Sequence, residues 1–107
     1  MYREFFELSG YRVLTAVDGD DAVRVATDSR PAIVVMDLMM PRTDGLEATR
    51  RLRANPLTRG IPVVALTGHG SQAADARARG VDFDAFLTKP CLPEQLLEEL
   101  QRVLARE

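Results

Sequence analysis

The sequence has few of the features that mark secreted or membrane-bound proteins. Its one cysteine, Cys91, cannot form an internal disulfide, so nothing indicates an oxidising compartment. No apolar run is long enough to span a bilayer, and acidic residues interrupt the N-terminal segment where a signal peptide needs an apolar core. A cytoplasmic location without membrane contact is therefore expected.

An excess of charge of one sign is also lacking. Sixteen acidic residues against 14 basic residues give a formal net charge of −2. A domain that binds nucleic acid directly usually carries a strong basic balance, so this composition predicts no direct nucleic-acid role. The 107 residues suit one domain with a single core, and no repeat or linker divides residues 1–107.

Apolar residues recur along the chain with two alternating spacings, one typical of strands and the other typical of helices. Strands are expected over residues 11–16, 32–36, 61–66 and 83–88, and helices over residues 2–9, 20–28, 45–55, 71–79 and from 93 onward. Strict alternation with short connections favours an α/β fold, in which helices cover both faces of a doubly wound parallel sheet.

Polar side chains follow three of the expected strands. Asp37 comes directly after an apolar run, Thr67 follows the next strand, and Lys89 follows the last one. Parallel strands end at one edge of the sheet, which is where open α/β folds place their ligand crevice. The sequence therefore predicts that an acid, a hydroxyl and an ammonium group converge there.

Three segments together resemble a known family: residues 37–46 (DLMMPRTDGL), 62–67 (PVVALT) and 86–90 (FLTKP). They are similar to the downstream signatures of the response-regulator receiver domain of bacterial two-component systems. The resemblance covers almost the whole chain and implies a flavodoxin-like fold. It also implies a signalling domain rather than an enzyme, with a sensor histidine kinase or phosphotransfer protein as its partner.

The resemblance further implies a role for each site residue. Asp37 would accept the phosphoryl group, Lys89 would contact a phosphoryl oxygen, and Thr67 would donate its hydroxyl. Asp37 and the main-chain oxygen of Met39 would bind Mg²⁺. Phe86 matches the aromatic switch position, although plain core packing explains it equally well. The Lys89-Pro90 bond is expected to be cis.

One part of the family pattern is missing. Receivers begin with a buried strand that ends in two acids, and this chain starts inside the following helix, about fifteen residues later. Without those acids Mg²⁺ would be held weakly, and the acids around Asp18 start a helix after a different strand. The absent strand either leaves a gap in the sheet or forces the strand around Val13 against the strand around Val35. An ordinary receiver lacking its start is favoured over a degenerate receiver or a partner that supplies the strand.

Two other classes stay open. Phosphatases of the haloacid dehalogenase type also use an aspartate at a strand end, but their second aspartate falls at position 39, which is methionine here. A structural α/β interaction domain is the other alternative. Exposed strand edges left by the missing segment would also favour a homodimer. His69 lacks a neighbouring ligand set and is expected to be an ordinary loop residue.

Overall fold

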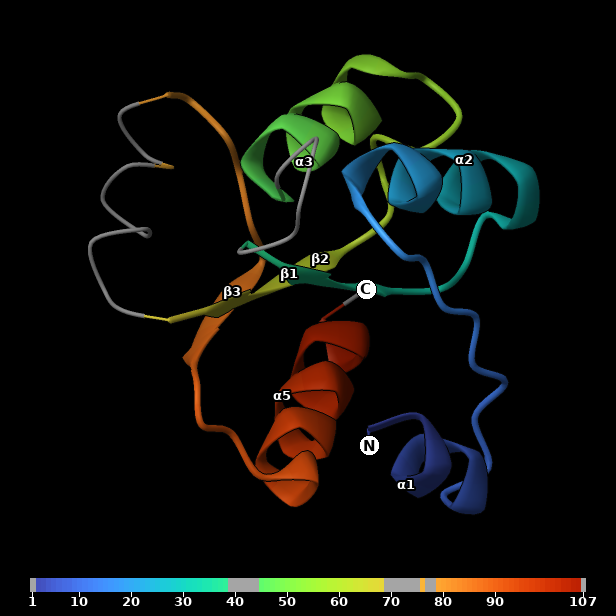
Figure 1. Cartoon of the computed structure of the whole chain (residues 1–107), viewed down its shortest axis with the longest axis vertical. Coiled ribbons are helices and arrows are strands. Elements are labelled where there is room, and N and C mark those ends of the chain that lie inside the picture. Colours follow the sequence, from blue (N-terminus) through green and yellow to red (C-terminus); the bar gives the residue numbers. More distant parts are fainter. Residues whose placement is uncertain (1, 39–44, 69–75, 77–78, 107) are drawn as a thin grey trace.

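The computed structural model of the chain describes residues 2–38, 45–68, 76 and 79–106. The bounds of its helices and strands are α1 Tyr2–Leu8, α2 Gly19–Ser29, β1 Val34–Asp37, α3 Gly45–Ala54, β2 Val63–Thr67, β3 Ala85–Thr88 and α5 Pro93–Ala105. Among these residues, helices and strands alternate from α2 to β2 as the sequence predicts, but α1 is followed directly by α2 and β2 by β3 (Figure 1). The helix expected over residues 71–79 falls almost entirely outside the described residues.

The described strands form a three-stranded parallel sheet in the order β1-β2-β3. Its parallel pairing, with helices on both faces, confirms the predicted α/β class. The strand expected over residues 11–16 is wrong, because no strand among the described residues pairs with this segment, which runs irregularly from α1 to α2 (Figure 1). Of the two outcomes foreseen for the sheet, a gap is the one observed, and a groove separates this segment from β1.

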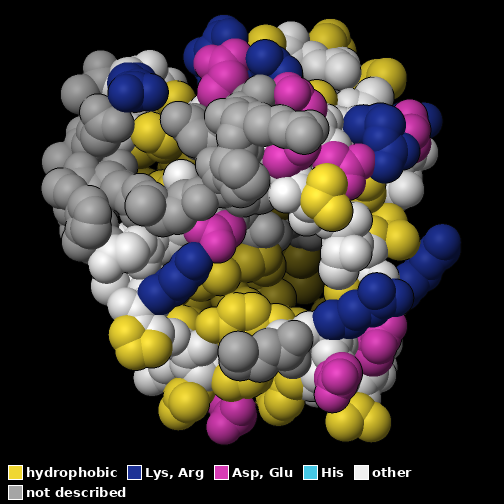
Figure 2. Space-filling view, in the orientation of Figure 1, with side chains coloured by type: hydrophobic (Ala, Val, Ile, Leu, Met, Phe, Trp, Pro, Cys, Tyr) yellow, Lys and Arg dark blue, Asp and Glu magenta, His cyan; other side chains and the backbone are white. Residues whose placement is uncertain are grey.

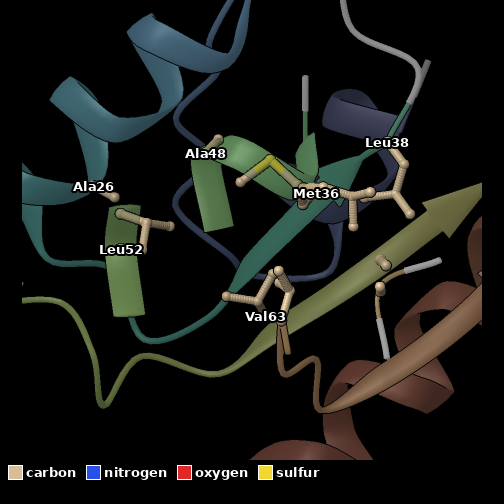
Figure 3. Packing of buried hydrophobic residues seen from close by; sticks show 10 residues of the cluster. Ala26, Met36, Leu38, Ala48, Leu52 and Val63 are labelled. Atoms are coloured by element: carbon tan, nitrogen blue, oxygen red, sulfur yellow. The ribbon is translucent and has the colours of Figure 1, made fainter. Parts of the chain in front are cut away.

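The sheet is the middle of three layers, with α2 and α3 on one face and α1 and α5 on the other (Figure 1). β2 is buried at every position, and its side chains alternate between the layers. Val63 and Ala65 face a cluster with Met36 and Leu52, which Figure 3 shows from close by. Val64 and Leu66 face a second cluster that contains Phe6, Leu96, Leu100 and Val103.

The helix ends follow local sequence signals. The carboxylate of Asp18 accepts a hydrogen bond from the main-chain N–H of Asp21 at 2.8 Å, so it caps α2, as the helix-start interpretation predicts. Helix α3 ends at Ala54, before Asn55-Pro56, and Pro93 begins α5. None of the helices in the described part of the chain has the length and apolar character that crossing a membrane requires.

An arginine joins the segments at the amino ends of β2 and β3. The Arg53 guanidinium donates to the main-chain oxygens of Asp82, Arg59 and Ile61, and it contacts the Asp84 carboxylate at 3.1 Å. The same carboxylate accepts the N–H of Val63, the first residue of β2, at 2.7 Å. This network fixes the end of the sheet opposite to the candidate site.

Candidate functional site

The candidate site lies where the three strands end. Asp37 is the last residue of β1, Thr67 is the last residue of β2, and Lys89 directly follows the last residue of β3. Since the strands are neighbours and parallel, these positions share one edge of the sheet. The structure therefore brings the three predicted site residues to the same edge.

Asp37 and Lys89 are in direct contact. The Lys89 ammonium donates a hydrogen bond to Oδ2 of Asp37 over 2.6 Å, although 52 residues separate them in the sequence. Their side chains remain 37% and 38% exposed, so a reactant from solution can reach the carboxylate. An ion pair this exposed contributes at most about 1 kcal/mol to stability. Its main physical effect is to hold a positive charge beside the carboxylate.

Thr67 contributes to the position of Lys89 through its main chain. Its carbonyl oxygen accepts the N–H of Lys89 at 2.8 Å, which extends the pairing of β2 and β3 by one step beyond the strand. The threonine is 2% exposed, so its place at the edge is fixed by burial. The peptide bond between Lys89 and Pro90 is cis, which confirms the prediction made from the resemblance.

Tyr2 adds a group that the sequence reasoning missed. Its hydroxyl donates to the main-chain oxygen of Cys91 at 2.5 Å, across 89 positions of the chain. Burial raises the pKa of Tyr2, Cys91 and the charge of Asp37 add to that rise, and the charge of Lys89 opposes it. The phenol thus links α1 to the segment that follows Lys89. Its sequence pattern indicated only an apolar helix face.

The described residues do not complete a magnesium site. Asp37 offers a carboxylate, but no group of three or more acidic, histidine or cysteine side chains suited to a metal occurs in the described part of the chain. Asp20 and Asp21 form ion pairs with Arg51 and Arg24 instead. Met39 and His69 lie outside the described residues.

Phe86 lies in β3, three residues before Lys89. It is half-buried and packs against the cluster that contains Met36 and Leu52. The ring of Phe83 meets it edge-on, with centroids 5.1 Å apart and an interplanar angle of 60°. This packing agrees with a core role and leaves the switch role as a prediction.

Comparisons with known proteins give one consistent result. The family model of the response regulator receiver domain matches residues 1–101. The phosphate regulon transcriptional regulatory protein PhoB of Pseudomonas aeruginosa is 36% identical over 100 residues, which are 94% of this chain and 44% of PhoB. The polar-differentiation response regulator DivK of Brucella anthropi is 30% identical over 104 residues, covering 97% of this chain and 85% of DivK.

Comparison with solved structures gives the same family. The receiver domain of the sensor histidine kinase PA1611 from Pseudomonas aeruginosa, crystallised with a magnesium ion in its active site cleft, matches with a TM-score of 0.85 and 33% identity, over 96% of this chain and 84% of that one. The chemotaxis response regulator CheY4 of Vibrio cholerae matches with a TM-score of 0.86 and 32% identity, over 96% and 86% of the two chains. The chain therefore belongs to the response regulator receiver domain family. Such domains are signalling modules of two-component systems, and phosphorylation and magnesium binding are general features of the family.

Proposed function

We propose that the chain acts as one receiver unit, residues 1–107, that accepts a phosphoryl group on Asp37 from a sensor histidine kinase or phosphotransfer protein. The contact of 2.6 Å between Asp37 and Lys89 carries this proposal. It gives an accessible nucleophile a neighbouring cation, and phosphoryl transfer depends mainly on position and on neutralised charge.

In this reaction an oxygen of the Asp37 carboxylate forms a bond to phosphorus. The bond between phosphorus and the imidazole nitrogen of the donor breaks, and that nitrogen keeps the electron pair. Lys89 then moves its hydrogen bond from the free carboxylate to a phosphoryl oxygen, and the Thr67 hydroxyl donates to another. As the Thr67 hydroxyl moves toward the phosphoryl group, Phe86 turns inward, and this movement alters a protein-binding face.

The magnesium ion of the family is not assigned to residues of this chain. With Asp37 as the described carboxylate at the strand ends, we propose weak Mg²⁺ binding that carboxylates from outside the 107 residues would strengthen. A receiver that works only by binding other proteins is the second candidate, because the described residues include no group of side chains suited to a metal ion. Phosphatase action has no such support, because methionine occupies position 39.

Intact-mass measurement after treatment with acetyl phosphate and Mg²⁺ tests the proposal. The 107-residue chain is compared with the same chain preceded by a strand that ends in two acids. We expect one hydroxylamine-labile phosphoryl group on the extended chain and none on its Asp37→Asn variant. Label that persists in this variant moves the acceptor elsewhere. No label on either chain favours the binding-only receiver, and continuous phosphate release would indicate a phosphatase.

A further inference from the structure

Lys89 lies at the start of a short segment that joins β3 to α5. The strand ends one residue earlier and the helix begins at Pro93, so residues 89–92 make the connection. The main-chain N–H of Lys89 donates to Thr67 at 2.8 Å, which holds the segment where it leaves the sheet. The next residue, Pro90, has no N–H to donate. The course of the chain after Lys89 therefore depends on other contacts.

Tyr2 supplies such a contact from another element. Its hydroxyl donates to the main-chain oxygen of Cys91 at 2.5 Å, and Cys91 follows Lys89 by two positions. The N–H of Leu92 bonds to the side chain of Gln95 at 3.0 Å, which belongs to α5 itself. Among the hydrogen bonds of the described residues, that of Tyr2 is therefore the one that ties this segment to a different helix.

The segment is exposed on either side of this contact. Leu92 is 61% exposed and Pro90 is exposed as well, whereas Cys91 between them is 9% exposed. The side chains of Cys91 and Tyr2 both pack on the cluster that contains Leu96. Packing at Cys91 thus fixes one point of the segment, and the hydroxyl of Tyr2 fixes the orientation of the peptide group there.

Tyr2 also lies close to the reacting groups. Its side chain lines the same hollow as Asp37 and Lys89. Figure 2 shows this hollow with hydrophobic side chains on its floor and charged side chains on its rim. Burial raises the pKa of Tyr2 above its ordinary value of 10.0. The phenol therefore keeps its proton at neutral pH and serves as a hydrogen-bond donor.

We propose that Tyr2 is a positioning residue for phosphoryl transfer, which fixes the segment after Lys89 and so keeps the Lys89 ammonium aimed at the oxygens of Asp37. This role rests on the proposed phosphoacceptor function of Asp37. The ammonium reaches Oδ2 of Asp37 over 2.6 Å from a side chain that is 38% exposed, so its main chain has a large part in where it points. Placement matters for the reaction, because a displacement of about 1 Å can lower a rate about a hundredfold.

Amine chemistry tests the positioning without any phosphoryl donor. Lys89 is the single lysine of the sequence, so its acetylation by dilute acetic anhydride can be followed by peptide mass. An ammonium that donates a hydrogen bond has no free electron pair and reacts slowly. We expect Tyr2→Phe to raise the acetylation rate of Lys89 in the 107-residue chain about threefold, the factor that the loss of one hydrogen bond allows. Asp37→Asn, which removes the charged acceptor, gives the upper limit of this rate.

Tyr11→Phe is the matched control. Tyr11 packs on the same cluster, and its ring meets Phe6 edge-on with centroids 6.1 Å apart. Its hydroxyl makes no hydrogen bond to any part of the chain that the structure describes, so Tyr11→Phe should leave the acetylation rate unchanged. Thermal melts show whether each variant is folded at the temperature of the assay. Equal rates in Tyr2→Phe and the unsubstituted chain, or equal changes in the two tyrosine variants, overturn the proposal.

Phosphorylation of the extended chain gives the second readout. Tyr2→Phe should lower the maximal labelling rate of Asp37 about fivefold, while the acetyl phosphate concentration that gives half of this rate stays unchanged. A variant that merely unfolds would lower the final yield of label instead. An unchanged labelling rate overturns the proposal. If the unsubstituted extended chain takes no label, the proposed function fails, and the acetylation rates still decide whether Tyr2 positions Lys89.

Discussion

A Cβ atom on residue 45 would lie 2.7 Å from the main-chain oxygen of Asp37. The same atom would lie 2.9 Å from Cα of Leu38, so main-chain atoms block it on two sides. The first residue of α3 therefore approaches the end of β1 as closely as glycine permits. The start of α3 is thus constrained by the same backbone that carries the proposed phosphoacceptor.

Replacing this glycine should disturb both stability and chemistry. We expect Gly45→Ala to lower the free energy of unfolding by about 1–3 kcal/mol, because the backbone must move to admit the methyl group. In the extended chain the yield of phosphorylated Asp37 should fall as well. Gly60→Ala is the matched control, because a Cβ there meets no atom within 4 Å. Urea titration measures the first effect, and equal losses in the two variants would contradict the steric explanation.

Lys89 should matter more for phosphorylation than for folding. Its ion pair with Asp37 is more than a third exposed, so Lys89→Gln should change the unfolding free energy by less than about 1 kcal/mol. Loss of the charge beside the phosphoryl group should lower the rate of labelling of the extended chain at least about tenfold. Arg24→Gln, which breaks another exposed ion pair, should alter neither labelling nor the site. A normal labelling rate in Lys89→Gln would remove the lysine from the proposed mechanism.

Adding a strand upstream of residue 1 should stabilise the chain. The groove beside β1 leaves apolar surface and main-chain groups exposed, so we expect residues 1–107 alone to melt at low temperature and to form dimers or aggregates. A strand ending in two acids should fill the sheet, give a stable monomer or a regulated dimer, and tighten the binding of Mg²⁺ and beryllofluoride. Thermal melts and sedimentation of the two chains measure this. Cooperative melting of the short chain as a monomer with tight beryllofluoride binding would contradict it.

The Glu47 carboxyl should have an unusually low pKa. Hydrogen bonds from Arg50 and then Arg51 lower the pKa of Glu47 from its ordinary value of 4.5 to about 2. A lowered pKa in the folded state means that the stabilising contribution is complete above pH 4.5 and is lost as the pH falls toward 2. Carboxyl resonances measured by NMR should show the low midpoint. Arg50→Gln should raise it, whereas Arg3→Gln, which removes the partner of Glu7, should not.

Most of the fold could be predicted because local signals agree with the tertiary arrangement. The apolar run before Asp37 forms β1, and the Asn55-Pro56 pair marks the end of α3. Residues 11–16 show the limit of this reasoning, because their pattern is typical of a strand. A strand also needs a hydrogen-bonded neighbour. The spacing of apolar residues within one segment does not indicate whether that neighbour is present.

The sequence also predicted the main residues of the candidate site, but not all of its contacts. Strand ends place Asp37, Thr67 and Lys89 on one edge, and the sequence showed each of these ends. The part of Tyr2 was not predictable, because its hydrogen bond to Cys91 depends on how α1 packs beside the segment that leads into α5. The close approach of Gly45 to Asp37 was also hidden, since a glycine after a loop has many possible causes.

The hydrogen-bond network around Arg53 lies at the end of the sheet opposite to the candidate site. It joins the amino ends of β2 and β3, one strand length away from Asp37 and Lys89. The hydrogen bonds that fix the sheet and the side chains that react therefore lie at opposite ends of the strands. A mutation of Arg53 would destabilise the sheet without changing any residue of the site. It would lower the yield of phosphorylated Asp37 only by increasing the unfolded fraction.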